Sequence, residues 1–133
     1  MQTKRIELVL RLAVAGEFLG HGVLAIQGKK QWIEWFSHFG IADPGTAGQL
    51  LFLIGLLDVA VALVVLVRPI RAFLLWATFW GFWTALVRPI VGEPIWDFIE
   101  RFANWGAPLA LLLLLGWPKN WREWLRDRQS VSV

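Results

Sequence analysis

The chain has no cysteine among its 133 residues, and this absence excludes several kinds of chemistry. Without thiols the chain itself forms no disulfide, gives no thiolate to a metal or an iron–sulfur cluster, and has no thiol–disulfide mechanism. Charged residues are also scarce, at 17% of the chain, whereas hydrophobic residues make up 57% and the mean hydropathy is +0.56. So few charges cannot cover the surface of a soluble protein. The composition therefore predicts an integral membrane protein with one domain, residues 1–133.

Several common functional motifs are missing as well. The sequence has no glycine-rich phosphate loop, no Ser-His-Asp order and no Glu-x-x-His spacing, so nothing in it supports a hydrolase or a nucleotide-binding protein. The net charge is only +3 and the cations are spread over helix ends, which argues against a nucleic acid partner. A haem would have to be held by His21 and His38, and only if the loop around His38 folded back over the bundle. We therefore expect no metal, no haem and no other intrinsic cofactor.

Four long apolar stretches fill most of the chain, at about 6–26, 47–67, 72–88 and 95–116. A helix of about 20 apolar residues crosses a hydrocarbon layer of roughly 30 Å. The turns between the stretches are short, so consecutive helices are expected to run in opposite directions. We predict an all-α fold, namely an integral membrane four-helix bundle with up-down-up-down topology.

Two shorter segments, about 30–39 and 118–128, are predicted to be amphipathic helices at the membrane surface. Aromatic residues recur every three or four positions in the first, and tryptophans alternate with lysines and arginines in the second. Between the first segment and the second long stretch, Asp43-Pro44-Gly45 predicts a turn, with Thr46 as the helix cap.

The lysines and arginines indicate how the predicted bundle is oriented. One side carries Lys4, Arg5, Arg68, Arg71, Lys119, Arg122, Arg126 and Arg128, and the other carries Lys29, Lys30, Arg88 and Arg101. Because cytoplasmic loops carry the excess of positive residues, both termini are predicted to be cytoplasmic.

Three ionisable residues, Glu17, His21 and Asp58, fall inside the predicted spans. A charge at the bilayer centre costs about 3 kcal/mol, so these groups are expected to face the bundle interior and to find partners or protons there. Glu17 and His21 are four residues apart on one helix face, which permits a hydrogen bond between them. We predict that the three residues form a proton relay or hydrogen-bond a ligand. The alternative is an ion network that only fixes the order of the helices.

A ligand would lie among aromatic side chains of the third stretch. Trp80, Phe82 and Trp83 are expected to line an apolar pocket between helices, while most of the other tryptophans anchor the protein at the membrane surface. A rise of about 1.5 Å per residue brings further polar groups from other stretches to a similar depth. The predicted ligand-binding residues are Trp80, Trp83, Arg88, Arg101 and Asn104.

Two glycines of the first stretch, Gly16 and Gly20, form a small-xxx-small step beside the polar pair. Such steps let the backbones of two membrane helices come close together. We interpret both glycines as helix-packing residues.

An early arginine, a glycine-rich end of the first stretch followed by Gly-Lys, and an acid in the second stretch occur together in this chain. The residues are Arg11, Gly16, Phe18, Gly22, Gly28, Lys29, Gly55 and Asp58. In this pattern, over roughly residues 5–116, the chain resembles the DoxX family, in which the acid of the second helix is usually glutamate. The resemblance implies a four-helix bundle in a prokaryotic inner membrane, often tied to respiratory redox chemistry. Relatives include a membrane subunit of thiosulfate:quinone oxidoreductase.

Three classes of function remain open at this point. The first is an accessory or quinone-interacting subunit of a membrane redox system, which requires a redox partner protein because the chain has no redox cofactor site of its own. The second is a binder or transporter of a small cationic or amphipathic molecule, held by carboxylates under aromatic rings. The third is a purely structural protein, such as a homo-oligomer or a lipid-bound partner, which predicts a filled core. Of the three classes, only the first would make this chain part of an enzyme.

Overall fold

The computed structural model describes residues 1–126, and all regular secondary structure in this part of the chain is helical, as predicted, with no strand. The elements are α1 (Gln2–Ile26), α2 (Lys30–Trp35), a 3-10 helix η1 (Phe36–Phe39), α3 (Pro44–Val67), α4 (Arg71–Ile90), α5 (Ile95–Ile99), α6 (Phe102–Leu115) and α7 (Trp121–Leu125).

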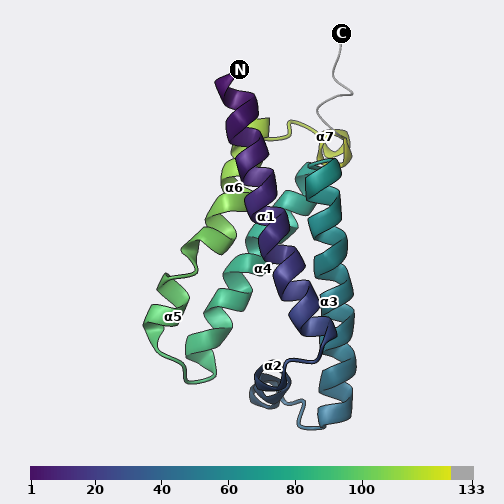
Figure 1. The fold of residues 1–133 in the computed structure, drawn as a ribbon, viewed down its shortest axis with the longest axis vertical. Helices are drawn as coiled ribbons and strands as arrows, with labels where there is room; N and C mark the ends of the chain where they lie inside the picture. The colour runs from purple at the N-terminus through teal and green to yellow at the C-terminus, as the bar shows by residue number, and fades with distance from the viewer. Residues whose placement is uncertain (127–133) are drawn as a thin grey trace.

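The long helices alternate in direction along the chain (Figure 1). α1 packs mainly on α3, and α4 packs mainly on α6, while α1 and α6 join the two pairs. The pairs lie close together at the end that holds the N-terminus and diverge toward the end that holds α2 and α5 (Figure 1).

Three helical segments are long and apolar enough to cross a membrane: Gln2–Ile26, Pro44–Val67 and Ile95–Leu115. They expose large apolar side chains on their outer faces, for example Leu53 and Leu113, each 59% exposed. The predicted third span, 72–88, does form a helix, Arg71–Ile90, but it is not among the three. Three tryptophans and an arginine near each end lower the mean hydropathy of this helix.

Each helix pair is held by glycines that bring two backbones into contact. A Cβ built on Gly22 would lie 2.9 Å from the Gly55 carbonyl oxygen, and one on Gly81 would lie 2.5 Å from the Asn104 carbonyl oxygen. By contrast, a Cβ on Gly16 or Gly20 would meet nothing within 4 Å. The interpretation of Gly16 and Gly20 as packing residues is therefore wrong, because these glycines face open space.

Two arginines cap helices of the same end of the bundle. Arg11 of α1 donates hydrogen bonds to carbonyl oxygens of the last turn of α3, at 3.3 Å to Val65 and 3.1 Å to Val67. Arg71 of α4 donates to the carbonyl oxygens of Leu115 (2.7 Å) and Gly116 (2.9 Å) at the end of α6. The last carbonyls of a helix have no partner within the helix, so each arginine satisfies groups that would otherwise be unpaired.

Of the two predicted surface segments, the first is confirmed as helical and the second is shorter than expected. α2 and η1 together occupy 30–39 as predicted, but the C-terminal helix covers only Trp121–Leu125 of the predicted 118–128, whose last two residues lie outside the described part. The cap of α3 is Asp43 instead of Thr46: its Oδ2 atom accepts hydrogen bonds from the Thr46 amide (2.8 Å) and hydroxyl (2.7 Å). An aspartate carboxylate accepts from the free amides of a first turn, which is why aspartate is a favoured cap.

Candidate ligand site

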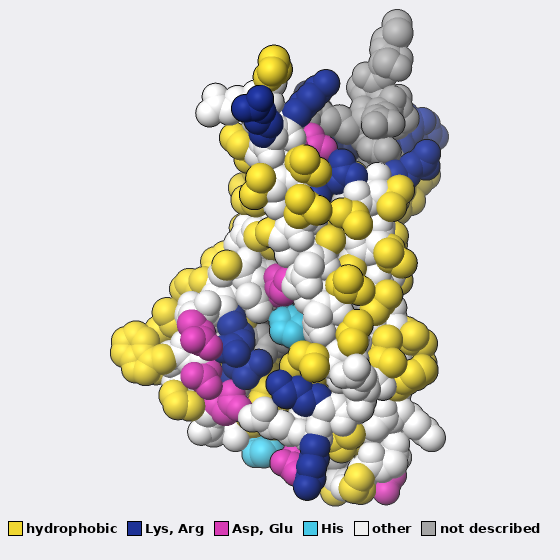
Figure 2. Space-filling view, viewed as in Figure 1, with side chains coloured by type: hydrophobic (Ala, Val, Ile, Leu, Met, Phe, Trp, Pro, Cys, Tyr) yellow, Lys and Arg dark blue, Asp and Glu magenta, His cyan; other side chains and the backbone are white. Residues whose placement is uncertain are grey.

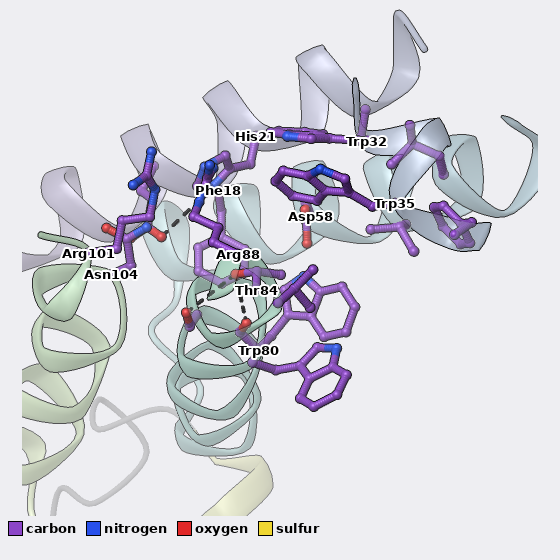
Figure 3. Close-up of a pocket in the computed structure, with 18 of the residues that line it drawn as sticks. Phe18, His21, Trp32, Trp35, Asp58, Trp80, Thr84, Arg88, Arg101 and Asn104 are labelled. Atoms are coloured by element: carbon purple, nitrogen blue, oxygen red, sulfur yellow. Dashed lines mark hydrogen bonds and ion pairs between the residues drawn. The ribbon is translucent and has the colours of Figure 1, made fainter. Parts of the chain in front are cut away.

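A cavity of about 260 Å³ lies between the helix pairs where they diverge (Figure 3). Side chains of α1, α3, α4 and α6 form its walls, and α2 and η1 lie across its end. The structure brings every predicted site residue to this one cavity: Glu17, His21, Asp58, Trp80, Trp83, Arg88, Arg101 and Asn104. Their roles stay predictions, but residues up to 87 positions apart in the sequence share one space.

Asp58 is the most buried acid of the site. It lies in the middle of α3, is only 4% exposed, and points into the cavity between Trp35 and Trp80 (Figure 3). The Trp80 indole interacts with the carboxyl group, but the Oδ1 atom has no hydrogen-bond partner within residues 1–126. A buried polar atom without a partner costs about 1–3 kcal/mol, so a ligand would gain by hydrogen bonding to Asp58, and also to the unpartnered Trp32 Nε1 and Arg88 Nε atoms.

Glu17 and His21 line the same wall of the cavity from α1. Their nearest atoms, Oε1 and Nδ1, are 3.8 Å apart. That distance allows an ionic attraction but is too long for a hydrogen bond, so the predicted hydrogen bond between them is absent. The His21 ring instead packs on Trp32, with the ring centroids 5.7 Å apart. Polar atoms of both side chains are thereby available to a ligand.

The two arginines of the site have anionic partners outside the cavity. Arg88 forms an ion pair with Glu93 at 3.1 Å, and its guanidinium lies over the Trp35 ring at 5.2 Å. Arg101 forms an ion pair with the neighbouring Glu100 and donates a hydrogen bond to the Asp97 carbonyl oxygen at 2.7 Å. No ion pair joins either arginine to Glu17 or Asp58 in the described chain.

One wall of the cavity was not predicted from the sequence. The segment 30–39, here called the aromatic lid, was expected to lie on lipid, but Trp32, Trp35, Phe36 and Phe39 all point into the cavity. Contacts with α4 and with the turn after it hold the lid over the cavity. The Gln31 side chain donates a hydrogen bond of 2.7 Å to Glu93 of the α4–α5 turn, and the ring centroids of Phe39 and Trp83 lie 6.1 Å apart. The aromatic spacing of the segment was the available signal, since an apolar stripe fits a protein cavity as well as it fits lipid.

Within α4 the prediction that Phe82 lines the cavity is wrong, and Thr84 was not predicted to line it. Phe82 is 41% exposed and packs edge-on against Phe98 and Trp105, away from the cavity. Thr84 lines the cavity and donates a hydrogen bond of 2.9 Å to the Trp80 carbonyl oxygen. Thr84 lies four residues after Trp80, so helical periodicity placed it on the same face.

Among residues 1–126, no group of three or more histidine, cysteine, aspartate or glutamate side chains is arranged to hold a metal ion. His38, the second histidine considered for haem, lies in η1 and does not line the cavity. The chemistry available here is hydrogen bonding and proton exchange by carboxyl and imidazole groups, beside rings that can stack on a flat ligand.

No protein-family model, curated protein or solved structure matches this chain.

Proposed function

We propose that this chain is a DoxX-like membrane protein that binds a quinone in its aromatic cavity and acts as an accessory subunit of a membrane redox system. In this proposal all four long helices cross a prokaryotic inner membrane, and both termini are cytoplasmic. The basic side chains gathered at the end of the molecule that holds the N-terminus support that orientation (Figure 2).

The observation that carries the proposal is the cavity with the unpartnered Asp58 oxygen among aromatic rings. A quinone head group is flat and apolar apart from its carbonyl oxygens. Trp80 and Trp83 on one side, and the aromatic lid on the other, offer ring faces for stacking. A protonated Asp58 would donate a hydrogen bond to one quinone carbonyl, and Glu17 or His21 would exchange protons with the other.

The electrons would come from a partner protein. Proton exchange by Glu17, His21 and Asp58 accounts for the protons of quinone reduction but not for its electrons, which need a redox centre. This chain would bind the quinone and exchange protons with it, and the partner would supply the electrons. The chain is therefore proposed as a subunit and not as a complete oxidoreductase.

A second candidate, binding of a small lipophilic cation, is favoured by a specific observation. Arg88 and Arg101 are paired with Glu93 and Glu100, so the carboxyl of Asp58 has no cationic partner in the described chain. A carboxylate beside tryptophan faces is also the arrangement that holds ammonium-type ligands.

Two substitutions of Asp58 separate these ligands. In detergent or nanodiscs, a short-chain benzoquinone at about 100 times its Kd is expected to stabilise the wild type by about 2.7 kcal/mol. Asp58→Asn keeps an N–H donor for a carbonyl oxygen, so most of this stabilisation should remain, whereas Asp58→Leu should abolish it. A lipophilic cation such as tetraphenylphosphonium should lose its effect with both variants, because both remove the negative charge.

Glu34→Gln is the matched control, since Glu34 lies on α2 and does not line the cavity. It should leave either effect unchanged. Stabilisation by the cation and not by the quinone would replace the first proposal with the second. Stabilisation of the wild type by neither probe would contradict both.

A further inference from the structure

We infer that the cavity opens sideways to the lipid, through a groove between α1 and the α5–α6 segment, and that this groove is the entrance for a membrane-dissolved ligand. The identity of that ligand and the lipid beside the groove rest on the proposed function, whereas the groove itself rests on the geometry. Figure 2 shows a patch of acidic, basic and histidine side chains on this face of the molecule, within a mostly apolar surface.

The groove and the cavity share residues. Gly16, Gly20 and Leu24 of α1 and Glu100 beyond the end of α5 line only the groove, whereas four other residues line both spaces. The shared residues are Glu17, His21, Arg101 and Asn104. These four side chains form the boundary that a ligand would cross between groove and cavity.

The two glycines keep the groove open. A glycine within a helix costs roughly 0.5–1 kcal/mol relative to alanine, and at Gly22 close backbone packing explains it. At Gly16 and Gly20 no neighbouring helix is close, since an added Cβ would meet nothing within 4 Å. Side chains at these two positions would project into the groove. The absence of side chains keeps the groove open, and this explains the two glycines where helix packing does not.

The opposite wall of the groove is an interrupted helix. The span Ile95–Leu115 breaks at Glu100 and Arg101, where the Arg101 amide bonds the Phe98 carbonyl oxygen, three residues back, at 3.2 Å. Irregular backbone at membrane depth is tolerated where it is buried in protein or lines a polar cavity, and such breaks mark ligand sites in membrane transporters. Here the break places Arg101 and Asn104 at the boundary of the cavity.

The other route into the cavity, from the water side, is covered by the aromatic lid. Phe39 packs on Trp83, Gln31 bonds Glu93, and Arg88 lies over Trp35, so the lid is tied to α4 and its following turn at three places. Beyond the groove, the unpartnered Oδ1 atom of Asp58, buried in the cavity, is the group that a ligand arriving this way would satisfy.

Because the natural chain has no cysteine, a single Thr84→Cys substitution gives a thiol inside the cavity that reports access without any ligand. In proteoliposomes, lipid-soluble N-phenylmaleimide should label this thiol much faster than a charged methanethiosulfonate reagent. Adding Gly20→Leu, or separately Gly16→Leu, should slow labelling by N-phenylmaleimide about tenfold, an increase in barrier of about 1.4 kcal/mol.

Gly106→Leu is the matched control, because Gly106 also faces open space but lines neither the groove nor the cavity. It should leave the labelling rate within about twofold of the Thr84→Cys parent, well under the tenfold effect. Circular dichroism checks that all variants keep their helices.

Three results would contradict the inferred entrance. The first is an unchanged labelling rate in both Gly16→Leu and Gly20→Leu, and the second is an equal slowing by Gly106→Leu. The third is labelling by the charged reagent as fast as by the lipid-soluble one. No labelling of Thr84→Cys by either reagent would also count against it. Quinone stabilisation is measured separately, so a slowed Gly20→Leu variant without quinone binding would keep the entrance and reject only the ligand.

Discussion

The two ends of the helix bundle differ in whether their polar groups have hydrogen-bond partners. At the end that holds the N-terminus, Arg11 and Arg71 have their guanidiniums bonded to helix carbonyls, around a core of fully buried side chains such as Val65 and Leu111. At the other end the helix pairs diverge, and Asp58 keeps an unpartnered oxygen beside a cavity. The comparison teaches that the first end carries the stability of the fold, and that the second is free to keep groups arranged for a ligand.

The largest effect is expected from Leu111→Ala. Leu111 is 0% exposed and lies in the core between the helix pairs, so its truncation should cost about 2–5 kcal/mol. The free energy of unfolding is measurable by titration with sodium dodecyl sulfate in mixed micelles. A loss below about 1 kcal/mol would show that this end is not the stable half.

The next largest effect is expected from Arg71→Met, which removes the hydrogen bonds to Leu115 and Gly116. Leaving the buried Leu115 carbonyl and the part-buried Gly116 carbonyl without these donors should cost about 1–3 kcal/mol in the same titration. Arg122→Met is the control, because Arg122 lies over the exposed Trp121 ring and caps no long helix. Equal losses in both variants would contradict a capping role for Arg71.

Glycines sharpen the comparison within one helix. Gly22→Ala should cost about 1–3 kcal/mol, since the new Cβ would lie 2.8 Å from Val59 and 2.9 Å from the Gly55 carbonyl oxygen. Gly16→Ala, six residues earlier, should raise stability by up to about 1 kcal/mol through helix propensity alone. Similar unfolding energies for the two variants would sink the distinction between packing and groove glycines.

A smaller effect on stability is expected from Asp58→Leu. Leucine removes the buried Oδ1 atom that has no partner, a gain that offsets the lost Trp80 contact, so the change should stay within about 1 kcal/mol. A loss of several kcal/mol would mean that Asp58 holds the helices together, as the ion-network alternative requires.

The smallest effect is a pH dependence at Asp43, outside the spans. Hydrogen bonds from the Thr46 hydroxyl and amide lower the pKa of the Asp43 carboxyl below its ordinary value. A lowered folded-state pKa gives stability that is present above the unfolded pKa and is lost as the pH falls through the folded pKa. Thermal unfolding should show a slightly larger acid-induced decrease for the wild type than for Asp43→Asn. Identical pH profiles would contradict this.

The sequence predicted the helices well, because each long apolar run has to be helical in lipid and ends at charges, prolines or glycines. Glu17, His21 and Asp58 are conspicuous in a sequence with few charges, and the structure brings them to one cavity, but their roles stay predictions. The partner of each helix was not predictable from apolar content. Gly16 and Gly22 look alike in the sequence, and only the crossing of α1 with α3 separates them.

The packing partner of the aromatic lid was likewise not predictable from the sequence. The spacing of Trp32, Trp35, Phe36 and Phe39 predicts an apolar face, but lipid and a protein cavity satisfy such a face equally. What decides between them is the hydrogen bond of Gln31 to Glu93, a contact over 62 positions that no local pattern contains.

The two capping arginines imply an order of events while the protein is being made. Arg11 of α1 finds its carbonyl partners only in α3, and Arg71 of α4 finds them only in α6 and the residues after it. An arginine within an apolar helix costs about 3 kcal/mol when it enters the bilayer unaccompanied. In the proposed four-span topology, each arginine-bearing helix would therefore insert most favourably together with the long helix that follows it, as two consecutive hairpins.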